Sequence, residues 1–138
     1  MYIEPTNENG RLVFEQGITG PVTMLNLLRF REEADYSAHP ELAPDEPITG
    51  REAYRRYVKH TLPFLSGEGG DLQFLGEGGS YLIGPLDERW DVVMLVRHAS
   101  LDAFIAMANN HEYLAGIGHR VAALGDSRLL PIVETDRI

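Results

Sequence analysis

The sequence predicts an α+β domain whose elements follow the order strand, helix, strand, strand, helix, strand. Two apolar runs with β-branched residues, Val22–Phe30 and Trp90–His98, are typical of strands. Between them a helix signature opens at Thr49, which is followed three residues later by Glu52. The length of 138 residues fits one domain, and no repeat or low-complexity linker divides residues 1–138.

The composition is that of a folded, acidic chain without cysteine. Hydrophobic residues make up 43% and charged residues 24%, which argues against intrinsic disorder. The 21 Asp and Glu residues outnumber the 12 Lys and Arg residues and give a net charge of −9, so we expect no nucleic-acid partner. The absence of cysteine excludes disulfides, thiolate catalysis and Cys-ligated metals.

Neither a membrane segment nor a secretory signal is visible in the sequence. No apolar run reaches the ~18–20 residues that span a bilayer. The N-terminal residues Met1–Pro5 do not combine a basic region with an apolar run. We therefore expect a cytoplasmic protein with no membrane partner.

The first third of the chain is expected to hold one strand between two irregular segments. Residues 1–20 are polar and should form an irregular lead-in, with a short turn at Leu12–Gln16. Val22–Phe30 follows the turn signal Gly20-Pro21 and should form the first strand. Residues 31–49 should form a long acidic loop, because from Glu32 onward they hold three prolines and six acidic residues but no Lys or Arg. A loop this long is expected to cover another part of the domain.

A helix is expected to begin at Thr49, which serves as its N-cap in a capping box with Glu52. Its apolar residues recur at helical spacing and make one stripe: Ala53, Tyr54, Tyr57, Val58, Thr61, Leu62 and Leu65. Because proline lacks the amide hydrogen that a helix needs, Pro63 should kink or end this helix near residues 60–62.

The next segment should contain two strands. Asp71–Pro85 is expected to form a strand that Gly76–Gly79 interrupts, either as a bulge or as a hairpin. Trp90–His98 is the clearest strand in the chain, with Val92–Val96 at its centre.

The last third should contain a broken helical region and a final strand. Ser100 is expected to cap a helix over Leu101–Ala108. A second helix should run over His111–Leu124 and end at Gly125. Ser127–Glu134 should form the fourth strand.

The expected strands are apolar on both faces. In the first strand Met24, Leu28 and Phe30 alternate with Leu25 and Leu27, and the third and fourth strands show the same pattern. The two helical regions should cover only one face, because both crossovers are right-handed and land on the same side. We therefore expect a homodimer joined through the other sheet face, with coverage by the N-terminal segment as the alternative.

Four segments resemble the domain of unknown function 1330 family. They are Met24–Phe30, Gly50–Tyr57, Trp90–Val96, and Glu112–Leu114 with His119-Arg120. The similarity runs from about Pro21 to Glu134, and the order and spacing of the segments carry it. It implies a ferredoxin-like α+β domain with a four-stranded antiparallel sheet that pairs into a dimeric α+β barrel.

The resemblance implies little about activity, because the family has no settled one. The wider superfamily includes cofactor-free monooxygenases, haem-degrading monooxygenases, muconolactone isomerases and amino-acid-sensing domains, and their activities carry over only as fold-level analogy. The haem-degrading relatives use an Asn, a Trp and a His that Asn26, Trp90 and His111 superficially echo. Because Trp90 begins its strand and no His has the spacing of the haem ligand, we expect neither haem nor another cofactor.

Asn26 and Arg120 are polar residues at positions where apolar ones are expected. Asn26 is mid-strand between two leucines. Its amide either makes its hydrogen bonds within the core or points into a pocket between sheet and helices, where it could bind a carbonyl or oxygen species. Arg120 projects to the apolar side of its helix, where it either meets Glu112 or Asp91 or holds a ligand carboxylate.

Further candidates are expected at the helices and at the ends of strands. His60 is the second candidate catalytic residue, as a general base. Alternatively, it is a residue at the edge of the helix stripe that makes one backbone hydrogen bond. Tyr54 and Tyr57 are either core residues or ligand contacts. The remaining candidate ligand contacts are Trp90, Arg29 and Arg97. Trp90 either anchors the core or forms the wall of a site for an aromatic ligand, and the two arginines lie at the ends of their strands.

A metal site is not expected. The five histidines include no His-x-His pair and no His-Glu-x-x-His motif. The glycines at 76, 78 and 79 precede neither Lys-Ser/Thr nor a helix, so a phosphate-binding loop is excluded as well.

Two functional hypotheses remain. In the first, a cofactor-free oxygenase- or isomerase-like enzyme acts on a small anionic or phenolic substrate, with His60 or a Tyr taking a proton, Asn26 holding an oxyanion, Arg120 fixing a carboxylate and the loop 32–48 closing as a lid. In the second, the chain is a non-catalytic metabolite-binding or purely structural dimeric module. The two differ in whether Asn26 and His60 face one cavity.

Overall fold

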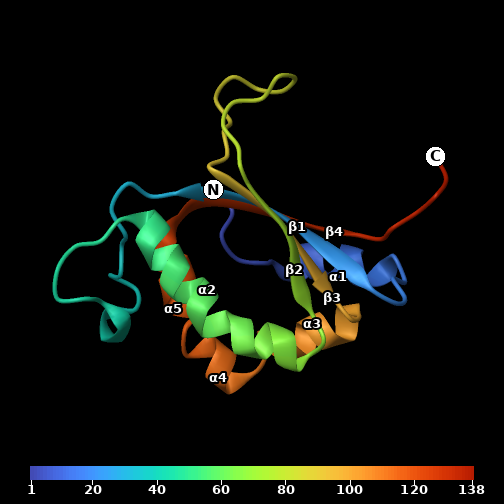
Figure 1. Cartoon of the computed structure of the whole chain (residues 1–138), viewed down its shortest axis with the longest axis horizontal. Coiled ribbons are helices and arrows are strands. Elements are labelled where there is room, and N and C mark those ends of the chain that lie inside the picture. The colour runs from blue at the N-terminus through green and yellow to red at the C-terminus, as the bar shows by residue number, and fades with distance from the viewer.

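The computed structural model describes all 138 residues and shows a four-stranded antiparallel sheet packed against one layer of helices (Figure 1). The strands are β1 (Val22–Phe30), β2 (Asp71–Glu77), β3 (Val92–His98) and β4 (Leu124–Ile132), in the order β2-β3-β1-β4. The helices α2 (Gly50–Gly67), α3 (Leu101–Ala108), α4 (His111–Leu114) and α5 (Ile117–Ala123) lie on the same side of the sheet. This order of elements is the ferredoxin-like α+β fold, as predicted.

The strand register assigns each side chain of the sheet to one of two faces. Asn26 is directly opposite Met94 of β3, and Leu28 is opposite Val92. Because Leu28, Val92 and Met94 belong to the core cluster that includes residues of α2 and α5, this is the helix-facing side. Leu25 and Leu27 therefore point to the other side, which we call the open face.

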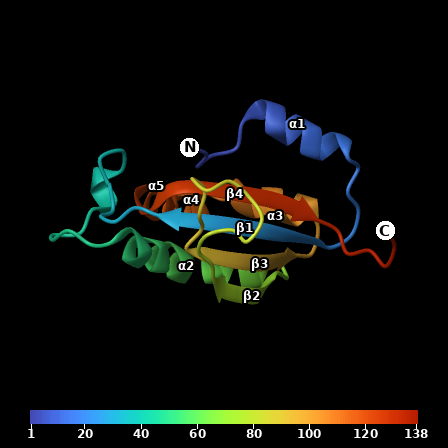
Figure 2. The same ribbon diagram turned by 90° about the horizontal axis from the view of Figure 1, so that it is seen from above.

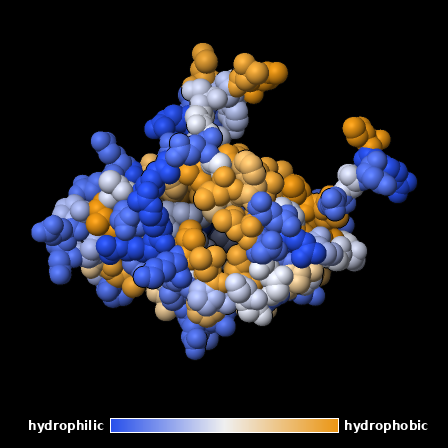
Figure 3. Space-filling view, in the orientation of Figure 1, coloured by the Kyte–Doolittle hydropathy of each residue, from blue (hydrophilic) through white to orange (hydrophobic).

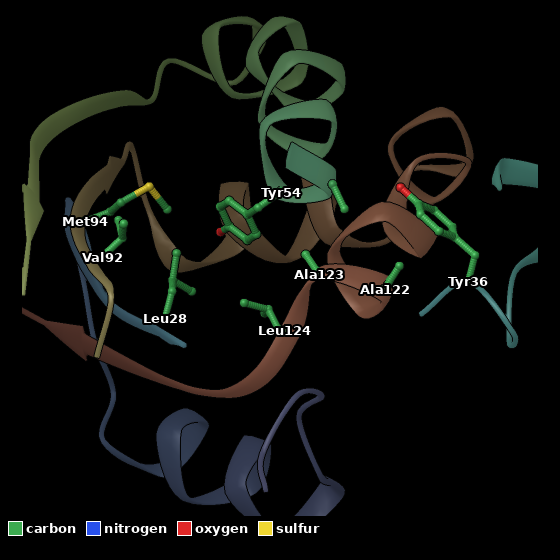
Figure 4. Close-up of a cluster of buried hydrophobic side chains, with 9 residues drawn as sticks. Leu28, Tyr36, Tyr54, Val92, Met94, Ala122, Ala123 and Leu124 are labelled. Carbon is green, nitrogen blue, oxygen red and sulfur yellow. The ribbon is translucent and has the colours of Figure 1, made fainter. Parts of the chain in front are cut away.

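The core is formed between the helix-facing side of the sheet and the two crossovers. Figure 4 shows Leu28, Met94 and Leu124 on the strands pointing toward Tyr54 of α2. A second cluster joins Leu65, Met107 and Tyr113. The helices thus cover one face only, and no helix of this chain lies on the open face (Figures 1 and 2).

The lead-in expected over residues 1–20 contains a helix, α1 (Asn7–Glu15). Thr6 caps it by accepting a hydrogen bond from the Asn9 amide, a signal that the polar composition of the segment obscured. None of its residues is buried, and Phe14 is 75% exposed. Figure 2 shows α1 beyond the β4 edge of the sheet, so it does not cover the open face.

Helix α2 begins where predicted but ends later. The Thr49 hydroxyl accepts a hydrogen bond from the Glu52 amide at 3.1 Å, while the Glu52 carboxylate pairs with Arg55 rather than completing the capping box. Of the two predictions for Pro63, a kink or an end of the helix near residues 60–62, the end was wrong, since α2 continues to Gly67. Packing of Leu65, two residues further on, holds the last turn in place. No helix of the chain is long and apolar enough to cross a membrane.

Further boundaries differ from the predictions, among them the start of β3 at Val92 and the span of β4 over Leu124–Ile132. β2 ends at Glu77, so residues 78–91 form a loop that closes with an isolated bridge between Ser80 and Arg89. The helix expected over 111–124 is broken between α4 and α5, because the chain turns at Ala115 and Gly116. Gly125 does not end this helix; it lies within β4, beside the register shift where β4 meets the end of β1.

A buried histidine links the end of α2 to the sheet. The Nδ1 atom of His98 lies 3.0 Å from a Glu68 carboxylate oxygen, and its ring packs edge-on against Phe104. The His98 residue is only 2% exposed. Burial lowers the pKa of His98 below its usual value of 6.5, and the attraction of Glu68 offsets this only in part.

The buried state of His98 makes the stability of the fold depend on pH. Since the unfolded chain takes up this proton near pH 6.5 and the folded chain only at lower pH, we expect the free energy of unfolding to fall as the pH drops below about 6.5. The loss should approach at most about 1.4 kcal/mol per pH unit for this group. His98→Gln should reduce the slope in urea unfolding between pH 7 and pH 5, whereas the exposed His111→Gln should not; equal slopes in all three proteins would contradict the assignment.

Candidate functional site

A hollow opens between the sheet and α2. Figure 3 shows it bordered by hydrophobic residues, and the same region of Figure 1 shows β2 and α2 on either side. The register places Leu72 and Leu75 of β2 opposite Val96 and Met94, on the helix-facing side. Leu72 is 41% and Leu75 61% exposed although they face the helices, which indicates that the hollow is open at this edge of the sheet.

Asn26 is a polar residue of the central strand β1 on the helix-facing side of the sheet, the side on which the hollow opens. It points to the helix-facing side with Met94, and its side chain is half-buried. The Nδ2 atom donates to the Met24 carbonyl at 3.1 Å, within the same strand. No protein donor reaches its Oδ1 atom, so one acceptor and one amide hydrogen remain free for another molecule.

A row of aromatic side chains lies between α2 and the rest of the helical layer. Tyr54 is buried between Phe30 and Tyr57, with ring centroids 5.4 and 5.3 Å away. The hydroxyls of Tyr57 and Tyr113 lie 2.7 Å apart. Burial raises the pKa of Tyr54 and of Tyr113 well above 10, so both hydroxyls stay protonated near neutral pH. This pair of hydroxyls joins α2 to α4. The sequence placed both tyrosines on apolar stripes but did not predict the hydrogen bond between them.

His60 faces α4 and not the sheet. Its Nε2 atom lies 2.8 Å from the Glu112 carbonyl oxygen and 3.2 Å from that of Tyr113. The ring also packs against Phe64 and against Gly116, where a Cβ atom would overlap it. The structure therefore does not bring the two candidate catalytic residues together: Asn26 belongs to the helix-facing side of β1, and His60 holds two helices together.

Arg120 does not meet either of the acids expected for it. Its Nη1 atom donates to the Ile3 carbonyl oxygen at 2.5 Å and so fixes the N-terminal segment to α5. Asp91, one expected partner, instead accepts hydrogen bonds from the Phe30 amide and from Arg89. A backbone acceptor from a distant segment could not be identified from helix periodicity.

The other three candidate contacts lie away from Asn26. Arg29 and Arg97 belong to the alternation that points to the open face. Trp90 is 3% exposed and packs at the base of the loop 78–91, where its Nε1 atom donates to the Tyr81 hydroxyl. None of the three borders the hollow.

The acidic loop packs against α5 and does not close over the hollow. It contains a short 3₁₀ helix, η1 (Pro40–Leu42). The Tyr36 hydroxyl lies 2.8 Å from Nδ1 of His119, and the Asp35 amide donates to the Ala122 carbonyl. Burial, together with Arg56 and His60, lowers the pKa of His119. The loop was expected as a lid, and the structure instead fixes it to the opposite end of the helical layer from β2 (Figure 1).

The helix-facing side therefore offers hydrogen-bonding groups, and the candidate cation Arg120 is held at the Ile3 carbonyl, close to Tyr54. The inward residues of α2 next to the sheet are apolar or uncharged, with Tyr54 and Val58 among them. No group of three or more His, Asp or Glu residues is placed to hold a metal ion. Such an arrangement can bind a largely apolar molecule and orient one polar group of it.

Comparison with known proteins identifies a relative over almost the whole chain. No family model matches the sequence, and a search of curated proteins finds no match. Among solved structures, RPA0582, a protein of unknown function from Rhodopseudomonas palustris, is 36% identical, with a TM-score of 0.82 over 99% of this chain and 98% of that one. The chain belongs to the family of RPA0582.

Two further solved structures are similar to this chain. The methylated form of RPA0582 is 34% identical, with a TM-score of 0.84 over 98% of this chain and 96% of that chain. The At3g17210 protein of Arabidopsis thaliana is 11% identical, with a TM-score of 0.52 over 85% and 98% of the two chains, and shows the shared fold alone. The RPA0582 family thus has the ferredoxin-like fold described above.

In this member of the RPA0582 family the contact between His60 and Gly116 should be structural. Gly116→Ala places a methyl group against the His60 ring, so we expect the free energy of unfolding to fall by about 1–3 kcal/mol. In a His60→Ala background the same change should cost about 1 kcal/mol less, because the ring is gone. Urea unfolding of the wild type, the two single variants and the double variant measures the coupling energy between His60 and Gly116. The matched control is Gly67→Ala, whose added methyl group meets no neighbour. Additive effects would show that the ring and Gly116 do not interact.

Proposed function

We propose that this protein binds a small, largely apolar molecule that carries a hydroxyl group, with a phenol as the best-fitting class. The observation that carries the proposal is the Asn26 amide, which lies on the helix-facing side of the sheet, where the apolar hollow opens, with its Oδ1 atom free of any protein donor. A mid-strand amide contributes less to packing than a leucine would, so its presence on the helix-facing side favours a role in recognition. The free Oδ1 would accept the hydrogen of the ligand hydroxyl.

The surroundings favour an uncharged ligand. Arg120, the candidate for a carboxylate, is bound to the Ile3 carbonyl, and Arg29 and Arg97 lie on the other face. An ionised ligand in the hollow would lose its hydration, and none of these three cations has been shown to reach it there. The phenolic part of the predicted substrate class is therefore supported better than the anionic part.

Binding is supported better than catalysis. A cofactor-independent oxygenase or isomerase that uses Asn26 for an oxyanion needs a proton acceptor within reach of the same ligand. His60 bonds to carbonyls of α4, and the hydroxyls of Tyr54 and Tyr113, whose pKa values are raised by burial, remain protonated. None of these residues is thus shown to serve Asn26 as a proton acceptor, which favours a role in holding a ligand over removing a proton from it. The resemblance to the domain of unknown function 1330 family, which we propose extends to the RPA0582 family, adds no activity.

The ligand proposal is tested with 4-propylphenol and 4-propylanisole, which differ in whether the oxygen carries a hydrogen. In isothermal titration calorimetry we expect the phenol to bind about three- to tenfold more tightly than the ether, the contribution of one hydrogen bond. Asn26→Leu should remove this preference while binding of the ether persists. Thr23→Val lies on the same strand but on the open face, so it should behave as the wild type. No saturable binding of the phenol, or an unchanged preference in Asn26→Leu, would refute the proposal.

We also propose that a second copy of the chain covers the open face. This face carries Leu25, Leu27, Val93, Leu95, Leu130 and Ile132 across three adjacent strands. Leu130 is 55% exposed in the single chain, as is expected of an apolar residue that becomes buried in an interface. A two-fold dimer would bury this patch against itself.

The dimer proposal predicts the behaviour of a single charge on the open face. Leu130→Glu should convert the dimer to a monomer in sedimentation velocity, because two carboxylates would be buried in the apolar interface. Leu114→Glu introduces the same charge on α4, at a residue of comparable exposure on the helix side, and should leave the dimer intact. A wild-type protein that stays monomeric at all concentrations would overturn this proposal.

A further inference from the structure

The loop between β2 and β3 carries an apolar tip that nothing in the single chain contacts. Residues 78–91 rise from the sheet on the side opposite the helices, as both Figure 1 and Figure 2 show. At the tip, Leu82, Ile83 and Leu86 are 100%, 92% and 104% exposed. Three fully exposed aliphatic side chains within five residues are unusual in a soluble protein and typical of a contact site.

The base of this loop is held by hydrogen bonds, so the direction of the tip is set by the fold. The Gly78 amide donates to the Asp91 carbonyl and the Trp90 amide to the Gly79 carbonyl, each at 3.1 Å. The Trp90 indole donates to the Tyr81 hydroxyl at 2.7 Å, which in turn donates to Glu88 at 2.7 Å. The apolar tip therefore extends from a hydrogen-bonded stem.

Arg128 of β4 connects this stem to the sheet. Its guanidinium lies 3.0 Å from the Glu88 carboxylate and 2.7 Å from that of Asp126. It also stacks on the rings of Trp90 and Tyr2, at 5.0 and 4.8 Å. Because Arg128 is opposite Leu27 in the register, the stem begins next to the apolar patch of the open face.

We propose that residues 78–91 act as a clasp that packs its tip, Leu82, Ile83 and Leu86, against a second copy of this chain docked on the open face. The proposal rests on the dimer proposed above and assigns the loop a part in it. The apolar tip and the apolar open face lie on the same side of the sheet, so one partner can cover both.

The distribution of charge favours a second copy as that partner. The chain has a net charge of −9, yet the carboxylates of Asp126 and Glu88 beside the patch are both paired with Arg128. Arg29 and Arg97 add positive charge at the strand ends of the same face. Two copies of this acidic chain can therefore approach through the open face with little repulsion between carboxylates.

The first test removes the apolar tip. In the variant with Leu82→Ser, Ile83→Ser and Leu86→Ser we expect the dimer dissociation constant in sedimentation velocity to rise roughly tenfold or more, because apolar area is lost from the interface. The three residues are exposed, so the variant should fold, which circular dichroism verifies. The matched control is Leu114→Ser on α4.

The second test locates the tip. Since the chain has no cysteine, Ile83→Cys provides a single thiol for benzophenone maleimide, and illumination should yield a species of twice the chain mass. Leu114→Cys, labelled in the same way, should yield little of it. A tip variant that dimerises like the wild type, with cross-links confined to one chain, would overturn the clasp and leave the dimer. A wild-type protein that is monomeric throughout would overturn the dimer and the clasp together.

Discussion

The structure depends on the position of β1, a strand that is apolar on both faces and hydrogen-bonded on both edges. β3 pairs with one edge and β4 with the other, so the backbone polar groups of β1 bond mainly to these neighbouring strands, while the Phe30 amide at its end donates to the Asp91 carboxylate. Its two apolar faces then need separate partners. The crossovers that connect the strands land on one side and supply the helices, and the same connectivity leaves Leu25 and Leu27 without cover from this chain.

Features that depend on local signals could be predicted from the sequence. The first strand, the start of α2 at Thr49 and the cap of α3 at Ser100 each follow from residues within a few positions of one another. Pro63 shows the limit of such signals, because packing of the next turn outweighs the hydrogen bond that the proline cannot make. Helix α1 was missed for a related reason: its cap at Thr6 is clear in retrospect, but it has no buried stripe.

The candidate site could be predicted only in part. Asn26 stands out in the sequence as an amide between two leucines, yet its face could not be assigned, since both faces of the strand are apolar and a single bulge exchanges them. The register with Met94 resolves this. The partners of His60 and Arg120 are backbone carbonyls of α4 and of the N-terminal segment, and acceptors of this kind carry no side-chain signature. The sequence could name these polar residues but not what they bind.

The two faces of β1 explain why the hollow and the clasp can coexist in so small a chain. A ligand site on the helix-facing side requires that α2 stand off from the sheet near Asn26, which removes packing that a domain of this size would otherwise use. A partner on the open face would restore buried apolar area without filling the hollow, since the two lie on opposite sides of the same strands. The hydrogen-bonded stem of the loop also favours the pairing of two copies. Because Trp90, Tyr81 and Arg128 already fix its direction, the loop loses little conformational freedom when its tip is buried, so most of the apolar contact is available to stabilise the pair.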